Sequence, residues 1–127
     1  MIYHITSRAL WRRAIEGGGY SPPSLQTEGF IHCSAREQVR AVADSLYRGQ
    51  ADLLLLCIDE SKLAADLRWE APAHPNPAGA RQPEVDSAFP HIYGALNLEA
   101  VAAALAFHEK AAGFELPPNL PQDRGPD

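Results

Sequence analysis

The chain has 127 residues, of which 46% are hydrophobic and 21% charged, and its formal net charge is −5. This length and composition predict one folded domain with its own hydrophobic core, which excludes disorder for the body of the chain. Nucleic-acid backbones are bound by clustered Lys and Arg, so the negative charge excludes a broad nucleic-acid surface and leaves room for one nucleotide in a local pocket.

The N-terminal sequence MIYHITSRALWRR lacks the long apolar segment of a secretory signal. No run approaches the roughly 18 apolar residues that cross a bilayer. The two cysteines, Cys33 and Cys57, form no CxxC pair, so no structural zinc site of the usual spacing is expected. We therefore expect a cytoplasmic protein that has no membrane segment and requires no metal.

Residues 1–5 are rich in β-branched and aromatic side chains and predict a first strand. Thr6 or Ser7 can cap the following helix, one face of which is apolar at helical spacing: Leu10, Trp11, Ala14 and Ile15. The glycines at 17–19 end this helix, because glycine adopts left-handed backbone angles at little cost. Residues 20–29 are expected to form a loop.

A second strand and helix follow this loop. Residues 30–33 predict a short strand, and Ser34 and Glu37 have the spacing of a capping box, in which each side chain bonds a backbone N–H of the first turn. The helix behind it has an apolar stripe made of Val39, Val42, Ala43, Leu46 and Tyr47. Gly49 ends this helix.

Strands dominate the second half of the chain. Residues 53–58 are six apolar residues without polar alternation, which predicts a strand buried on both faces. A turn or short helix is expected at 59–63, a strand at 67–70 and a distinctive aromatic block at 89–94. This order of elements favours an α+β domain with helices packed on a strongly curved sheet.

Three further segments are defined mainly by composition. Residues 71–87 are rich in proline and predict a long functional or mobile loop. The alanines of residues 98–107 favour a helix. Residues 117–127 are also rich in proline and predict a disordered tail, which leaves residues 1–116 as the single domain.

Three histidines lie in or beside predicted strands: His4, His32 and His91. Strand alternation places His4 on one face with Thr6, and His32 on one face with Ser34. Any one of them is compatible with an ordinary hydrogen-bonded strand histidine. Three histidines in similar settings favour a common polar cleft.

Three kinds of site are compatible with such a cleft. In a nucleotide pocket, imidazole and hydroxyl groups would bond ribose, and Tyr3, Trp69 or Tyr93 would stack on a ring. A three-histidine metal site is the second kind, although the sequence has no HxH or HxxxH spacing. The third is a Cys33 nucleophile activated by a histidine, which is opposed by the fact that Cys33 and His32 point to opposite faces of a strand.

The tripeptide Arg68-Trp69-Glu70 has two interpretations. It can be a core tryptophan flanked by a surface ion pair, which stabilises little. Alternatively, Glu70 polarises a sugar hydroxyl or accepts a proton while Arg68 binds an anionic group. The remaining histidines, His74 and His108, are interpreted as ordinary surface residues.

Five sequence blocks carry a family resemblance: YHIT at 3–6, PSL at 23–25 with EGFIHCS at 28–34, DLLLL at 52–56, RWE at 68–70 and FPHIYG at 89–94. Over about residues 1–116 they resemble the bacterial family catalogued as domain of unknown function 952. That family is similar to the ADP-ribosyltransferase superfamily, including the RNA 2′-phosphotransferases, which use NAD. The resemblance implies an ADP-ribosyltransferase-like α+β fold, with a curved, split, antiparallel-rich sheet and two or three helices.

The resemblance also implies roles for individual residues. His32, Glu70 and His91 would be catalytic. The cofactor NAD would be bound by His4, Ser34 and Tyr93, to which strand alternation adds Thr6 and the anion-binding interpretation adds Arg68. In place of the helix favoured by composition, residues 98–100 would form a turn and residues 101–107 a strand.

The leading hypothesis is an enzyme that transfers ADP-ribose from NAD to a small molecule, a phosphate or a nucleic-acid end. Charge placement around an oxocarbenium-like sugar would drive this transfer. A second hypothesis is a nucleotide-binding or sensor module without turnover, and a third is a structural or partner-binding domain without a ligand. The expected partner in the first two cases is a small-molecule nucleotide.

Overall fold

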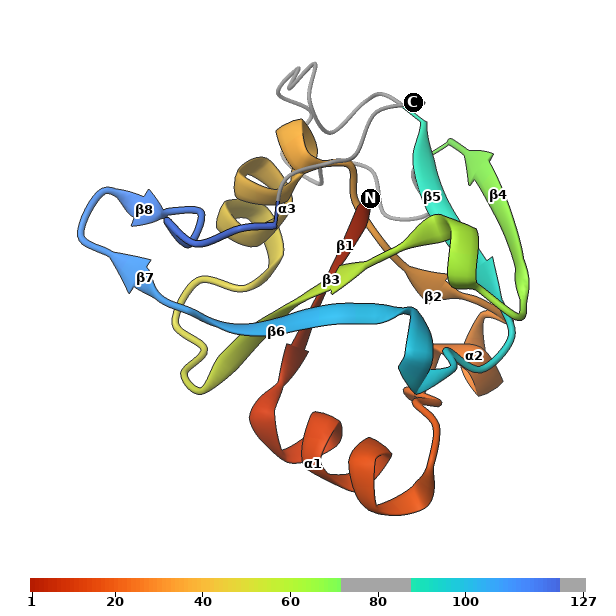
Figure 1. The fold of residues 1–127 in the computed structure, drawn as a ribbon. Coiled ribbons are helices and arrows are strands. Elements are labelled where there is room, and N and C mark those ends of the chain that lie inside the picture. The colour runs from red at the N-terminus through yellow and green to blue at the C-terminus, as the bar shows by residue number, and fades with distance from the viewer. Residues whose placement is uncertain (72–87, 122–127) are drawn as a thin grey trace.

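Two three-stranded antiparallel sheets organise the computed structural model, which describes residues 1–71 and 88–121 (Figure 1). The first sheet has the order β1-β3-β6 and contains β1 (Ile2–Ser7), β3 (Leu53–Ile58) and β6 (Val101–Phe107). The second has the order β2-β5-β4 and contains β2 (Ile31–His32), β4 (Asp66–Glu70) and β5 (Phe89–Tyr93). A small hairpin pairs β7 (Glu109–Lys110) with β8 (Gly113–Phe114). With three α-helices in the described part, the fold is α+β, as expected.

Strand β3 is central to the first sheet and is buried along its whole length, which confirms the prediction from its unbroken apolar run. Because side chains alternate along a strand, β3 supports two separate cores. Leu56 and Ile58 belong to one core together with Tyr20 and Ile92. The second core contains the intervening β3 residues Leu53, Leu55 and Cys57, packed with Tyr3, Val39 and Phe114.

Helix α1 (Arg8–Gly17) lies between β1 and the loop that leads to the second sheet. Ser7 caps it by accepting the Leu10 N–H at 3.1 Å, and Gly18 ends it with a left-handed φ of 82°. Leu10, Trp11 and Ala14 pack on the first core, but Ile15 is 55% exposed, so its placement on the apolar face was wrong. Ile15 lies about 140° around the helix from Leu10, beyond the buried stripe.

Two local predictions between β1 and β3 need correction. Helix α2 (Ser24–Thr27) lies within the expected loop. The predicted capping box is displaced by one residue: Gln38, not Glu37, accepts the N–H of Ala35 at 2.8 Å. The cause is tertiary, because Ser34 is still extended and pairs with β1, so the short helix η1 (Arg36–Gln38) and α3 (Val39–Leu46) begin later.

Composition also misled the prediction for residues 98–107. They form the short helix η3 (Leu98–Ala100) and then β6, which agrees with the family resemblance and not with the helix favoured by alanine. Along β6, residues alternate between partly buried and exposed until Phe107. Pairing with β3 along the strand outweighs the modest helix propensity of alanine.

An antiparallel bridge between Tyr3 and Ser34 joins the two sheets. The Tyr3 N–H donates to the Ser34 carbonyl at 2.8 Å, and the Ser34 N–H donates to the Tyr3 carbonyl at 2.7 Å. By the two-residue period of the ladder, the backbone groups of Ile5 also face away from β3. Beyond the bridge, the edge of β1 therefore borders the space between the sheets.

The rest of the described chain completes the domain. The short helix η2 (Glu60–Lys62) occupies the predicted turn, and β4 begins one residue before its predicted start. Leu116 and Leu120 pack against the second core. Most of the predicted loop at 71–87 and the end of the predicted tail lie outside the described residues. Across residues 1–71 and 88–121, no helix is both long and apolar enough to span a membrane.

Candidate functional site

A cleft of about 700 Å³ opens where the two sheets meet. It is lined by all three of the histidines that the sequence singled out, His4, His32 and His91, together with Thr6 and Ser34. The remaining predicted site residues, Glu70, Arg68 and Tyr93, lie behind His91 on β4 and β5 and are not part of the lining. The structure thus brings five of the eight predicted residues into one cleft and places three as its support.

The floor of the cleft is a hydrogen-bonded network around His4. The Nδ1 atom of His4 lies 2.5 Å from the His32 carbonyl, and its Nε2 atom lies 2.7 Å from the Tyr20 hydroxyl. The Tyr20 hydroxyl is also 2.8 Å from Oγ1 of Thr6. Both nitrogens of His4 therefore have protein partners, and the ring ties β1 to β2 and to the segment after α1.

The chemistry of these partners fixes the protonation of His4. A carbonyl can only accept, so Nδ1 carries the proton and Nε2 is the unprotonated nitrogen of the neutral ring. Burial lowers the pKa of His4 from 6.5 to about 4, which outweighs the opposing effect of the carbonyl hydrogen bond. His4 is neutral at physiological pH, and burial likewise raises the pKa of Tyr20.

The free energy of unfolding is expected to fall as the pH drops from 6.5 towards 4. In this interval His4 gains a proton in the unfolded chain but not in the folded one, so acid favours unfolding. A difference of this size corresponds to a loss on the order of 3 kcal/mol. Urea unfolding at successive pH values should show a flatter dependence for His4→Asn than for the wild type. His108→Asn, at an exposed position, should keep the wild-type slope, and equal slopes for all three proteins would contradict this account.

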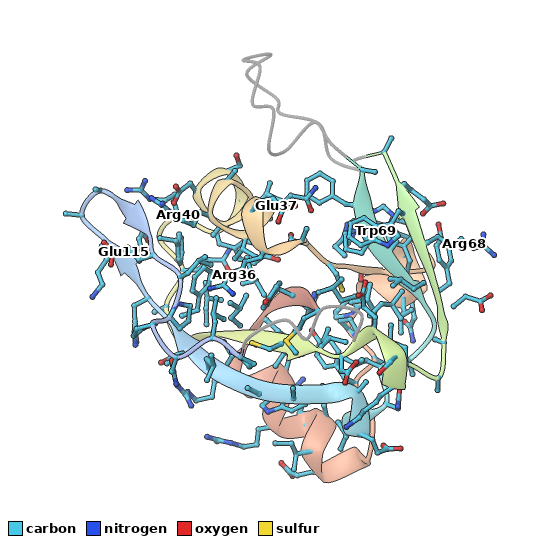
Figure 2. The ribbon with its side chains drawn as sticks, turned by 45° about the horizontal axis from the view of Figure 1, so that its top comes forward. Arg36, Glu37, Arg40, Arg68, Trp69 and Glu115 are labelled. Carbon is cyan, nitrogen blue, oxygen red and sulfur yellow. The ribbon has the colours of Figure 1, made fainter. Side chains whose placement is uncertain are left out.

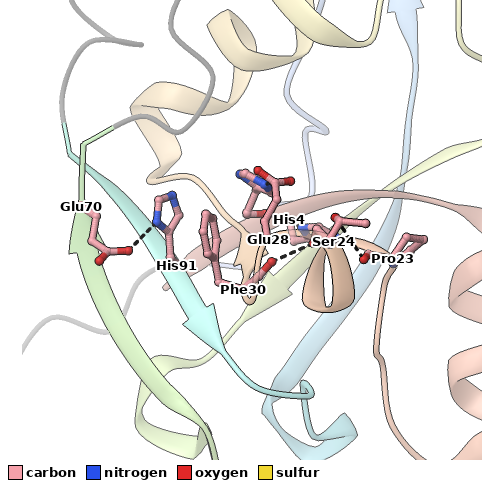
Figure 3. A network of polar contacts seen from close by, with 9 residues as sticks. His4, Pro23, Ser24, Glu28, Phe30, Glu70 and His91 are labelled. Atoms are coloured by element: carbon pink, nitrogen blue, oxygen red, sulfur yellow. Dashed lines mark hydrogen bonds and ion pairs between the residues drawn. The ribbon is translucent and has the colours of Figure 1, made fainter.

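The wall of the cleft is a cross-strand pair of histidines. His32 on β2 and His91 on β5 are directly opposite in the antiparallel register, so both rings lie on one face, with centroids 5.7 Å apart. The ring of Phe30 contacts both histidines. It stacks on His91 with the ring centroids 4.2 Å apart, and it is tilted against His32 with the centroids 4.7 Å apart. The Ser24 hydroxyl donates to the Phe30 carbonyl at 2.8 Å, which ties α2 to the start of β2 (Figure 3).

Behind this wall, Glu70 holds His91 in place. Nδ1 of His91 lies 2.8 Å from Oε1 of Glu70 (Figure 3). The Tyr93 hydroxyl donates to the same oxygen at 2.5 Å. The hydrogen bonds from Tyr93 and His91 lower the pKa of Glu70, and the bond to Glu70 raises the pKa of Tyr93. The carboxylate therefore fixes the proton of His91 on Nδ1 and directs Nε2 away from Glu70.

Arg68 and Trp69 do not match either interpretation of their tripeptide fully. Both lie on the outer strand β4 (Figure 2). The Arg68 guanidinium lies 4.6 Å above the ring of Tyr93. Trp69 is 50% exposed, so its interpretation as a core residue was wrong. It lies on the edge strand β4, where it pairs with Pro90, and no further strand of the described residues covers its ring.

The structure argues against the two other kinds of site. Cys33 is buried in the first core, and burial raises the pKa of its thiol, so the nucleophilic thiolate is disfavoured. Within the described residues, no group of three or more His, Cys, Asp or Glu side chains is arranged to hold a metal ion. His4 also uses both ring nitrogens in protein hydrogen bonds, so it has no lone pair to offer.

Sequence reasoning missed three residues of the site: Tyr20, Phe30 and Glu28. Tyr20 was assigned to a loop, yet it is buried and bonded to His4. Glu28 accepts from Nε2 of His32 at 2.9 Å, across a spacing of four residues that was visible in the sequence. Phe30 and Glu28 both fall within the EGFIHCS block, so the block itself was the available signal.

Comparison with known proteins gives a family and a fold. The family described as "Protein of unknown function (DUF952)" matches residues 5–104. A crystal structure of protein CC0527 from Caulobacter crescentus is similar, with a TM-score of 0.72 and 35% sequence identity over 89% of this chain and 90% of that one. The solution NMR structure of CC0527 gives a TM-score of 0.70 and 34% identity over 89% of each chain.

No curated protein matches this chain. The matched residues 5–104 include His32 and His91 of the cleft. They also include Glu70 and Tyr93, which lie behind His91. His4 lies one residue before the matched range. The chain belongs to the DUF952 family, as its five sequence blocks indicated.

Proposed function

We propose that this protein is an enzyme that uses its histidine-lined cleft for proton transfer on a nucleotide, with NAD-dependent transfer of ADP-ribose as the specific reaction. The observation that carries the proposal is the Glu70–His91 pair, in which a carboxylate behind the ring leaves Nε2 for a ligand in the cleft. A carboxylate-supported imidazole is a common general base. The ADP-ribosyltransferase-like reaction itself rests on the sequence resemblance.

The cleft has the size and lining for such a ligand. A volume of about 700 Å³ is within the roughly 300–1,000 Å³ of small-molecule sites. Leu10, Pro22 and Tyr47 provide apolar surface for a ring, and Thr6 and Ser34 provide hydroxyl groups for a ribose. His4 is a positioning residue in this arrangement, because its two nitrogens already hold the His32 backbone and Tyr20.

In the proposed reaction, an oxygen of the acceptor attacks the ribose carbon that carries nicotinamide. The carbon–nitrogen bond breaks, and its electron pair leaves with nicotinamide as the neutral ring. Nε2 of His91 takes the proton of the acceptor hydroxyl, and the imidazolium that forms is stabilised by Glu70. His32, held by Glu28, orients the nicotinamide half.

Thermal unfolding with millimolar NAD, ADP-ribose or nicotinamide tests binding. A ligand at about 100 times its dissociation constant should stabilise the fold by roughly 2.7 kcal/mol, which is a shift of several degrees for a domain of this size. The shift should disappear in His32→Ala. If none of the three compounds shifts the unfolding of the wild type, the NAD proposal is wrong.

A second candidate function is nucleotide binding without turnover. The observation that favours it is that Oε1 of Glu70 accepts hydrogen bonds from both His91 and Tyr93. In this interpretation Glu70 holds the wall of the cleft together and has no part in a reaction. Incubation of the protein with NAD for several hours separates the two functions. Released nicotinamide supports the enzyme, whereas bound and intact NAD supports the binding module.

A further inference from the structure

The lining of the cleft provides apolar surface for a ring and hydroxyl groups for a ribose, but it has no obvious group for a phosphate. None of its described lining residues is Lys or Arg, and one of them, Glu28, is acidic. Phosphate groups in protein sites are normally held by cationic side chains or by clustered backbone N–H groups. The described lining therefore offers no Lys or Arg side chain to the phosphate of a nucleotide whose nucleoside part occupies the cleft.

A second cavity of about 390 Å³ adjoins the cleft. The two share Leu10, Tyr20 and the Pro22–Pro23 segment, so they are neighbouring compartments on the two sides of this partition. Unlike the cleft, the second cavity has an arginine, Arg13, in its lining. Ser21 and Gln26 add neutral polar groups. Arg13 forms no ion pair with any residue in the described ranges, so no carboxylate of that part of the chain neutralises its guanidinium.

The partition between the two cavities is rigid. Tyr20 is 2% exposed, and its backbone exchanges hydrogen bonds with Leu96 at 3.0 and 2.9 Å. Its hydroxyl is held by His4 and Thr6 on the side of the cleft. Because these hydrogen bonds hold the partition in place, a ligand that spans both compartments would lose little free energy to reorganisation of the protein.

We propose that the cavity at Arg13 is the phosphate subsite for the nucleotide bound in the cleft. This inference rests on the proposed function, and it names the part of the ligand that the cleft alone does not recognise. The nucleoside lies among the histidines, the ligand crosses the Pro22–Pro23 rim, and its phosphate bonds the Arg13 guanidinium, with Gln26 and Ser21 as neutral donors. The site therefore prefers a phosphorylated nucleoside to the free nucleoside.

Nicotinamide mononucleotide and nicotinamide riboside test this subsite, because they differ by one phosphate. We expect the wild type to bind the mononucleotide about tenfold more tightly at low salt, as a charge-assisted hydrogen bond at an exposed site would give. In Arg13→Ala this ratio should fall to about one while the affinity for the riboside stays unchanged. Titration calorimetry of both compounds measures the ratio directly.

Arg12 provides the matched control. It is exposed, lies on the same helix and carries the same charge, but it does not line the cavity. Arg12→Ala should keep the wild-type ratio, Arg13→Lys should keep part of it, and added NaCl should reduce it. A ratio that survives Arg13→Ala, or that falls equally in Arg12→Ala, overturns the subsite.

The two proposals fail in different ways in this experiment. Equal binding of the mononucleotide and the riboside by the wild type would overturn the phosphate subsite and leave the cleft as a nucleoside site. Binding of neither compound by the wild type would overturn the subsite together with the proposed function. Because Arg13 is exposed, its variants should retain the wild-type melting temperature, which the same samples can show.

Discussion

Replacement of His91 by alanine should reduce nicotinamide release from NAD by roughly 10²- to 10⁴-fold, the usual contribution of a positioned general base. The imidazole lines the cleft, and the lost group is the proton acceptor of the proposed reaction. Since His91 is only 3% exposed, His91→Gln is the companion variant, which keeps more of the side-chain volume while removing the base. Initial rates of nicotinamide release at saturating NAD measure the effect.

Glu70→Gln should have a smaller effect, on the order of 10- to 100-fold, because Glu70 acts through His91. Glutamine keeps the shape of the side chain but removes the charge that stabilises the imidazolium formed in the reaction, so kcat should fall with little change in KM. A purely structural role for Glu70 would change stability without lowering kcat. His108→Ala, at an exposed position, should keep the wild-type rate. Full activity in both His91 variants would remove His91 from the mechanism.

The fold was predictable where one physical effect dominates a segment. Six consecutive apolar residues in β3 leave no face for water, so burial on both sides followed directly. Ser7 and Gly18 mark the ends of α1 through local chemistry that does not depend on the rest of the chain. For β6, local alanine propensity and long-range pairing disagree, and the register with β3 determined the outcome.

The site was predictable as a set of residue types and less so as a network. The three histidines that the sequence singled out in or beside its strands meet in one cleft. What the sequence could not supply was distance: His4 contacts the backbone of His32 and the hydroxyl of Tyr20, which are 28 and 16 residues away. The two cavities and their shared partition are likewise products of packing and not of any sequence spacing.

The second large effect is expected in the core that supports His4. Leu56→Ala should lower the free energy of unfolding by about 2–5 kcal/mol, because a fully buried leucine leaves a cavity that the surrounding sheet cannot fill. Leu56 pairs with His4 across β1 and β3 and packs in the same core as Tyr20. Urea unfolding at pH 7, where His4 is neutral, measures the loss.

Two leucines make this prediction specific. Leu46→Ala removes the same atoms at a position that is 49% exposed, so its cost should stay below about 1 kcal/mol. Leu55→Ala should cost about as much as Leu56→Ala, but it lies in the second core, away from Tyr20. Of the two buried variants, only Leu56→Ala should weaken nucleotide binding in the fraction that remains folded. If Leu55→Ala weakens it equally, the support of His4 extends through the whole first sheet and does not depend on the Tyr20 core.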